Sequence, residues 1–218
     1  MKIGLISDTH IPSMGAEPPS QVVQAFEGVD LILHAGHVDI DSCIKWLERI
    51  APVTATTSWL VGTGEALPRV NTVKVVEAEN HTIGICHELI LKSLSDDVIP
   101  GAIGRAFPPG ESLPDALRGI FGKPVDIVVF GYTHEAMVET HQGVLFVNPG
   151  SPSLVKQNIR LGTVAILEVT PKSRAARIID LAALDACDVL VRISALEGGG
   201  AFQAAKRLVA RARIRRNS

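Results

Sequence analysis

The sequence predicts a layered α/β protein in which two sheets pack together and helices cover their outer faces. Short runs rich in β-branched residues recur along the chain, and several are apolar at consecutive positions, as in strands buried on both faces. Helix-like stretches separate the early strands in the order βαβαβ, whereas strands predominate later in the chain. This change of pattern favours two packed sheets flanked by helices.

The expected strands are short, mostly aliphatic runs. They are Lys2–Ser7, Asp30–His34, Val53–Thr56, Val73–Val76, Thr82–Cys86, Asp126–Phe130, Val144–Val147 and Thr163–Val169.

Three helices are expected between these strands. Ser20 can cap the first, Asp41 or Ser42 can cap the second, and the third covers Leu113–Phe121. The segment Lys92–Leu113 holds several prolines and glycines and is interpreted as a long surface loop, a kind of segment that is usually functional or mobile.

We expect one domain over residues 1–196, followed by a glycine linker and a basic C-terminal helix over residues 197–218. Gly198–Gly200 marks the break, and apolar residues recur beyond it at helical spacing. Lys206–Ser218 holds six basic residues and no acidic one. A solvated terminus is the simpler interpretation. Nucleic-acid binding is the alternative, but the tail lacks interleaved aromatic residues.

Composition excludes several classes of protein. Of the 218 residues, 46% are hydrophobic, which excludes a disordered chain, and no apolar run approaches the roughly 18 residues that span a bilayer. Asp8 follows the amino terminus too closely for a signal-peptide apolar region. Cys43, Cys86 and Cys187 are widely spaced and odd in number, as in a reducing compartment. A cytoplasmic protein is expected.

Histidines gather where the predicted strands end. Each such histidine alone is more often a core or surface residue, but ligand sites in sheet proteins collect at strand ends. Neutral imidazole and carboxylate together suit Zn, Mn, Fe or Ni. The sequence therefore favours a site for a divalent transition metal. The residues concerned are Asp8, His10, His34, His37, His87 and His134.

Several short motifs resemble those of the calcineurin-like metallophosphoesterases. They are Asp8-x-His10, His34-Ala35-Gly36, His87, Gly131-x-Thr133-His134 and Asn148-Pro149-Gly150-Ser151. The resemblance covers roughly residues 1–170 and points to small bacterial and archaeal phosphodiesterases and to the phosphoesterase-fold subunit of retromer. It implies a four-layer αββα sandwich with two metal ions between loops at the strand ends.

The resemblance also implies roles for individual residues. Asp8, His10 and His134 match ligands of the first metal, and His87 matches a ligand of the second. Tyr132 stands where the family has a histidine, and the family's asparagine ligand has no secure counterpart around Ser58–Glu65.

His37 stands where the family has an aspartate that bridges both metals. A neutral imidazole has one free lone pair and no charge, so His37 can bind one ion only, and two cations about 4 Å apart then repel each other. We therefore expect one or two ions, namely a mononuclear centre on Asp8, His10 and His134 with His37 as a fourth ligand, or a binuclear centre with a weak second position.

The expected function is a metal-dependent phosphoesterase that hydrolyses phosphodiesters through a metal-bound hydroxide. His37 and His87 are the candidate catalytic residues, with His87 donating a proton to the leaving oxygen or contacting phosphate. The alternative is a catalytically inactive scaffold of the same fold that binds other proteins. A homo-oligomer is compatible with the sequence. Supporting roles near the metals fall to Gly36, His34, Tyr132 and Asn148.

Overall fold

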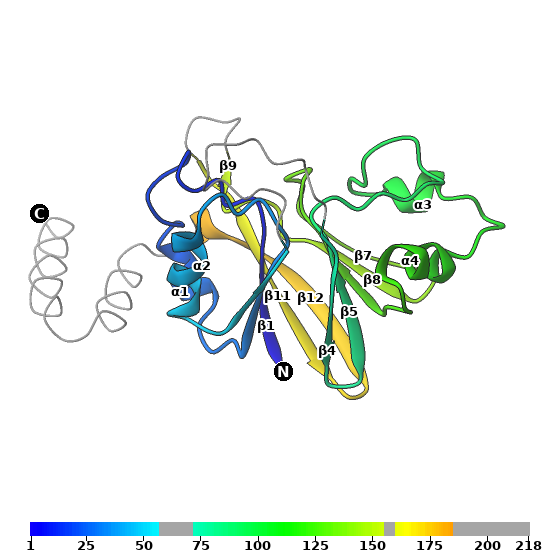
Figure 1. The fold of residues 1–218 in the computed structure, drawn as a ribbon, viewed down its shortest axis with the longest axis horizontal. Helices are drawn as coiled ribbons and strands as arrows, with labels where there is room; N and C mark the ends of the chain where they lie inside the picture. Colours follow the sequence, from blue (N-terminus) through cyan, green and yellow to red (C-terminus); the bar gives the residue numbers. More distant parts are fainter. Residues whose placement is uncertain (57–71, 155–159, 185–218) are drawn as a thin grey trace, which may run out of the picture.

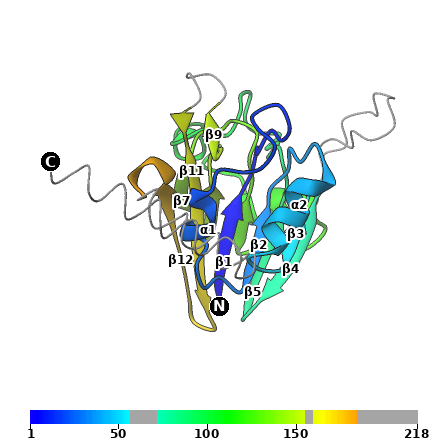
Figure 2. The same cartoon turned by 90° about the vertical axis from the view of Figure 1, so that its left-hand side faces the viewer.

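Two five-stranded mixed sheets lie face to face in the computed structural model, which describes residues 1–56, 72–154 and 160–184 (Figure 1). The first sheet has the order β12 (Ser173–Asp180), β11 (Thr163–Thr170), β1 (Lys2–Ile6), β2 (Leu31–His34) and β3 (Val53–Ala55). The second has the order β4 (Lys74–Ala78), β5 (His81–Ile85), β6 (Ile127–Val129), β8 (Val144–Asn148) and β7 (Met137–His141). Figure 2 shows β1 between β11 and β2.

Helices cover the outer face of each sheet (Figure 1). They are α1 (Gln21–Ala25) and α2 (Asp41–Glu48) on the first sheet, and α3 (Ala102–Ala106) and α4 (Leu113–Phe121) on the second. The αββα sandwich implied by the resemblance is therefore confirmed. Three smaller elements complete the described chain, and they are β9 (Ser153–Leu154), β10 (Arg160–Leu161) and the short 3-10 helix η1 (Leu181–Ala183).

The alternation of side chains along each strand builds three apolar layers. In β1, Leu5 faces the second sheet, whereas its neighbour Ile6 faces α1 and α2. In β8, Leu145 faces the first sheet and Phe146 faces the layer below α3 and α4. All four side chains are almost fully buried. Burial on both faces explains why these strands are apolar at consecutive positions.

Helix ends differ in part from the sequence predictions. Ser112 caps α4 as its hydroxyl accepts a hydrogen bond from the Asp115 amide, and Gly122 ends the helix in the left-handed conformation. Ser20 is the N-cap residue of α1, as predicted, but its hydroxyl makes no capping bond and instead donates to Gln21 Oε1. The cap position of α2 is Ile40, one residue before the predicted Asp41, and it supplies no capping side chain.

The predicted strands are present, with ends shifted by one or two residues, but other elements were missed. The loop prediction over Lys92–Leu113 overlooked α3, and no strand was expected at β7 or β12. Two segments named in the sequence analysis lie outside the described residues: the predicted tail over residues 197–218, and Ser58–Glu65. Over residues 1–56, 72–154 and 160–184, the structure has no helix long and apolar enough to cross a bilayer.

The carboxyl ends of the parallel strands determine where a site can form. Strands β1, β2 and β3 run parallel in the first sheet, as do β5, β6 and β8 in the second. Ligand sites in such sheets lie in the loops that follow the carboxyl ends. In this fold those loops carry the histidines singled out from the sequence.

Candidate metal centre

Five candidate ligands meet from four loops that belong to both sheets. Asp8 and His10 follow β1, His37 follows β2, His87 follows β5 and His134 follows β6. Asp8 is fully buried and His87 is almost so, whereas His10, His37 and His134 are partly exposed. The centre therefore has an enclosed floor and a rim of imidazoles that solvent can reach.

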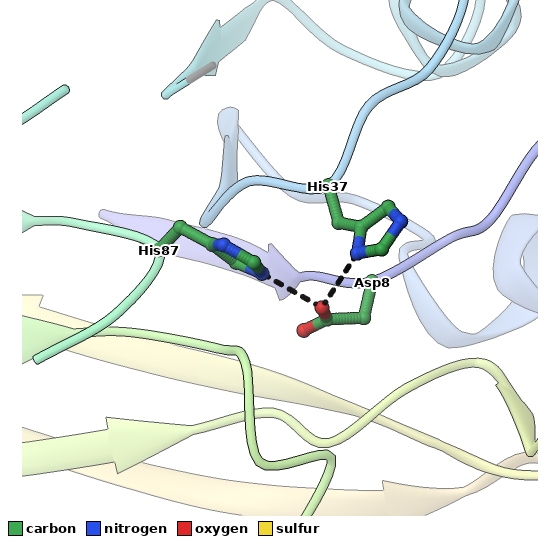
Figure 3. Close-up of side chains that lie close together, drawn as sticks. All are labelled: Asp8, His37 and His87. Carbon is green, nitrogen blue, oxygen red and sulfur yellow. Dashed lines mark hydrogen bonds and ion pairs between the residues drawn. The ribbon is translucent and has the colours of Figure 1, made fainter. Parts of the chain in front are cut away.

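One oxygen of Asp8 lies at the middle of this cluster. Asp8 Oδ1 is 2.8 Å from His87 Nε2 and 3.5 Å from His37 Nδ1, and Figure 3 shows both contacts converging on that atom. His134 Nε2 approaches the same oxygen to 3.3 Å. Asp8 Oδ1 thus faces three imidazole nitrogens at once.

The donor atoms fall into two groups that share Asp8. One group is Asp8, His10 and His134, in which the two Nε2 atoms are 3.2 Å apart, and the other is Asp8, His37 and His87. Ligands at 2.0–2.1 Å from a tetrahedral ion lie about 3.3–3.4 Å from one another. The distances of 3.2, 3.3 and 3.5 Å are close to this value, whereas Asp8 Oδ1 and His87 Nε2 lie at a hydrogen-bond distance of 2.8 Å. The residues present therefore fit one or two transition-metal ions.

The other Asp8 oxygen is held by the backbone. Asp8 Oδ2 accepts a hydrogen bond of 3.0 Å from the Tyr132 amide, and the Asp8 amide donates to the Gly36 carbonyl at 3.0 Å. Ser151 Oγ donates to the Asp8 carbonyl at 2.8 Å. These bonds join the loops after β1, β2, β6 and β8, so Asp8 Oδ1 is left to face the imidazoles.

Two glycines allow the loops to approach each other. A Cβ atom at Gly131 would lie 2.5 Å from Asp8 Oδ2, and one at Gly36 would lie 2.5 Å from His87 Cβ. Gly36 also has a φ of +95°, a conformation that side chains rarely allow. No larger residue fits at either place without displacing a candidate ligand.

The backbone at the site is unusual. Five residues of the site have positive φ angles, between 51° and 72°. They are Asp8, His10, His37, Tyr132 and His134. Non-glycine residues rarely adopt this conformation, and each instance costs on the order of 1–3 kcal/mol. Such outliers concentrate at functional sites, where the surrounding structure holds them in place.

Burial and proximity control the charges in the cluster. Burial alone would raise the pKa of Asp8, but hydrogen bonds from His134, His37 and His87 outweigh it and hold that pKa well below its usual range. Burial, with the neighbouring His37 and His134, lowers the pKa of His10 to about 4. At neutral pH the site therefore presents an ionised carboxylate and a neutral His10 imidazole, the forms that bind metal.

Comparison with known proteins agrees with this geometry. Residues 1–172 match the calcineurin-like phosphoesterase superfamily domain. The chain belongs to this superfamily. A probable metallophosphoesterase of Methanothermobacter thermautotrophicus is 30% identical over 155 residues, covering 71% of this chain and 78% of the relative. A probable metallophosphoesterase of Methanocaldococcus jannaschii is 32% identical over 159 residues, covering 71% and 69%.

Solved structures share the fold at lower identity. An archaeal phosphodiesterase aligns with a TM-score of 0.52 and 23% identity, over 82% of this chain and 100% of that protein. Vps29 of Entamoeba histolytica, solved in complex with Zn2+, aligns with a TM-score of 0.54 and 18% identity, over 83% and 99% of the two chains. These likenesses support the calcineurin-like phosphoesterase fold.

Asn148 and Tyr132, which the sequence predicted as supporting residues, lie beside the candidate ligands. Asn148 Nδ2 donates to the Gly131 carbonyl and to Thr133 Oγ1, at 3.0 and 3.1 Å, while its Oδ1 accepts from the Gly150 amide at 2.9 Å. The side chain thus braces the loop that carries His134. Tyr132 packs its ring against His87 with a centroid separation of 5.7 Å.

Sequence reasoning missed some of the residues that hold the candidate site together. Gly131 and Ser151 belonged to quoted motifs, but nothing in the sequence indicated their contacts with Asp8. Asp39, whose Oδ1 lies 3.6 Å from His37 Nε2, was also missed. An acidic residue two positions after a histidine was the available signal. The structure also groups His37 with His87, whereas the sequence analysis placed it beside His10 and His134.

His34 gives the protein a pH-dependent stability. The side chain is fully buried, its Nε2 lies 3.3 Å from Thr9 Oγ1, and burial lowers its pKa to about 3. In the unfolded chain its pKa is near 6.5, so between pH 6.5 and 3 the unfolded state binds the extra proton. This contribution to stability is complete above pH 6.5 and is lost as the pH falls toward 3.

We expect His34→Gln to flatten this dependence. Between pH 7 and pH 5 the wild-type protein should lose about 2 kcal/mol of unfolding free energy through His34, and the variant should not. Urea unfolding in EDTA at both pH values measures the difference. Equal losses in the two proteins would contradict the assignment.

Proposed function

We propose that this protein is a metal-dependent phosphoesterase that hydrolyses phosphodiesters at the centre built around Asp8. The observation that carries the proposal is the convergence of three imidazoles on one buried carboxylate oxygen, at distances of 2.8, 3.3 and 3.5 Å. Membership of the calcineurin-like phosphoesterase superfamily supports a hydrolase. The archaeal phosphodiesterase of the same fold supports a diester substrate.

Two positions for ions are proposed, of unequal strength. Asp8, His10 and His134 would hold the first ion, and Asp8, His37 and His87 would hold the second. Because both groups draw on a single carboxylate, the second position carries little negative charge to offset a second cation. We therefore expect the second ion to bind more weakly than the first.

The donor chemistry limits the choice of metal. One carboxylate and four imidazoles favour Zn, Mn, Fe or Ni over Mg or Ca, which prefer sets of oxygen ligands. The Zn2+ bound to the Vps29 structure supports Zn as one candidate. When bound, such a cation lowers the pKa of a water molecule to about 7 and polarises a phosphoryl oxygen.

The residues of this chain then bind phosphate and move a proton. His10 and His134 are partly exposed, so their ring N–H groups can meet an incoming phosphate at the rim. His87 lies beneath them, with its Nε2 facing Asp8 Oδ1. With the second position free, His87 can hold a proton beside this carboxylate and give it to the leaving oxygen.

The proposal places the enzyme in the cytosol. Cys43 and Cys86 are buried free thiols, as expected for a protein from a reducing compartment. The phosphate-ester substrate is the partner that the site requires.

A metal add-back assay tests the function. The protein is stripped of metal by dialysis, and Mn, Zn, Ni or Fe is returned singly while hydrolysis of bis(p-nitrophenyl) phosphate is followed. We expect turnover only with metal, and faster turnover of this diester than of p-nitrophenyl phosphate. Stoichiometric metal binding without turnover for any ion would instead support the scaffold alternative.

The replacement His37→Asp tests the account of the second position. A carboxylate there would add a negative charge and a second oxygen between the two ions. We expect the variant to bind the second ion at least about tenfold more tightly. Titration calorimetry with Mn or Zn measures both affinities, and His37→Ala separates the lost imidazole from the gained carboxylate. An unchanged second affinity would contradict the account.

A further inference from the structure

The His37 ring lies between two carboxylates. Its Nδ1 is 3.5 Å from Asp8 Oδ1, and its Nε2 is 3.6 Å from Asp39 Oδ1. Nothing in the function proposed above uses Asp39. At 3.6 Å the contact between Asp39 and His37 is an electrostatic attraction rather than a short hydrogen bond. The attraction favours one orientation of the His37 ring without fixing it.

The local chain directs Asp39 toward the site. Its neighbours Val38 and Ile40 both pack into the core beneath α1 and α2. Ile40 is extended, with φ −140° and ψ 148°, and side chains alternate along extended backbone. With its two neighbours in the core, the Asp39 side chain lies on the opposite side, where it meets His37. The side chain is only 18% exposed, so water screens the contact incompletely.

This arrangement has a chemical consequence for His37. A neutral imidazole carries its proton on one nitrogen and its lone pair on the other. In the metal-free protein the Asp8 carboxylate attracts the proton to Nδ1, and the Asp39 carboxylate opposes it by attracting the proton to Nε2. Once an ion takes the Nδ1 lone pair beside Asp8 and His87, the proton lies on Nε2 and faces Asp39. A carboxylate behind a ligating histidine fixes its tautomer and orientation and raises its basicity.

The negative charge of Asp39 also favours metal binding at the position that His37 contacts. The two proposed positions share one carboxylate, and the neutral His37 adds no negative charge. Asp39 brings a second negative charge next to the weaker position, and it does so through the imidazole rather than as a ligand. The His37–Asp39 pair can therefore compensate in part for the carboxylate that the centre lacks.

We propose that Asp39 is a positioning residue for His37, holding the ring with its proton on Nε2 and strengthening the binding of the metal ion that His37 contacts. This inference rests on the proposed function, because it assumes that the centre binds metal. It assigns to Asp39 no contact with substrate.

Metal affinity and ring tautomer together test the inference. His37→Ala first identifies which binding step depends on His37, by calorimetric titration of the metal-free protein with Mn or Zn. Asp39→Asn should weaken that step by about tenfold and leave the other within twofold. In long-range 1H–15N NMR spectra of the metal-free proteins, the fraction of His37 protonated on Nε2 should be larger in the wild type than in Asp39→Asn, where only Asp8 attracts the ring proton. A purely structural role would not move the tautomer.

Two further variants control this experiment. Asp39→Glu keeps the charge and should recover part of the lost affinity. Asp41→Asn removes the same charge two residues away, where Asp41 is 74% exposed and pairs with Lys45 at 2.6 Å. It should leave both affinities and the His37 tautomer unchanged. Circular dichroism shows whether each variant is folded. If Asp39→Asn does not fold, the metal affinity of Asp39→Glu and the fraction of wild-type His37 protonated on Nε2 test the inference instead.

The possible outcomes separate this inference from the function itself. If the wild type binds metal and turns over, yet Asp39→Asn leaves the His37-dependent affinity and the tautomer unchanged, the inference alone is overturned. The same holds if His37→Ala alters no binding step, or if Asp39→Asn weakens both steps equally. A wild type that binds no metal overturns the proposed function together with the inference.

Discussion

Asp8→Asn should reduce metal-dependent phosphodiester hydrolysis by about a thousandfold or more. The substitution keeps the shape of the side chain and replaces the one charge that both donor groups share. Its Oδ1 faces three imidazoles, so an amide there leaves both ion positions without an anion. Steady-state rates at saturating Mn or Zn, together with the number of ions bound, measure the effect.

Asp126→Asn is the matched control for this experiment. Asp126 lies at the amino-terminal end of β6, whereas the candidate centre follows the carboxyl end of this strand. Its Oδ2 accepts a hydrogen bond of 2.9 Å from the Thr82 amide. An amide oxygen can still accept that bond, so the variant should keep wild-type turnover and ion number. If Asp8→Asn retained more than a tenth of the wild-type rate, catalysis would not depend on the shared carboxylate.

Gly131→Ala should remove most of the activity without adding or deleting any polar group. The new Cβ would lie 2.5 Å from Asp8 Oδ2 and 2.8 Å from the Ser7 side chain, both in the buried floor of the site. The clash must displace the Asp8 carboxylate or the loop that carries His134. A displacement of about 1 Å costs on the order of a hundredfold in rate, and overpacking costs about 1–3 kcal/mol in stability. Kinetics and urea unfolding measure the two effects separately.

Gly119→Ala provides the comparison. Gly119 lies within α4, and no atom lies within 4 Å of a Cβ built there. Alanine in the middle of a helix is better than glycine by about 0.5–1 kcal/mol, so this variant should be slightly more stable and fully active. Equal activity in the two alanine variants would show that Asp8 tolerates displacement, contrary to the packing described above.

The interior strands could be predicted because they are buried on both faces, and the edge strands β3 and β4 because each contains two adjacent β-branched residues. In β8 every side chain is buried, and the first four residues, Val-Leu-Phe-Val, show this as a continuous apolar run. The missed strands β7 and β12 lie at the edges of their sheets, where half of the side chains are partly exposed and polar. Such strands mix small, charged and apolar residues, as many loops do, so their sequence pattern does not distinguish a strand from a loop.

The candidate site could be predicted as a set of residues but not as an arrangement. The position of each histidine after an apolar strand indicated that Asp8, His10, His37, His87 and His134 would meet. Which imidazoles pair with each other depends on loop conformation, which local sequence does not specify. The grouping of His37 with His87 arises from positive φ angles and from the contact between Gly36 and His87. Neither is visible without the three-dimensional packing.

Backbone hydrogen bonds join the loops that carry the candidate ligands. The Asp8 amide donates to the Gly36 carbonyl, and the Gly131 amide donates to the His87 carbonyl at 2.9 Å, so the polypeptide itself makes both contacts. The entropy of ordering these ligands is therefore lost when the polypeptide folds, not when the cation binds. Small zinc domains behave in the opposite way, since they are unfolded without their metal. If the centre binds metal as proposed, a chelator should remove the ion and leave these loops folded and joined by their own hydrogen bonds.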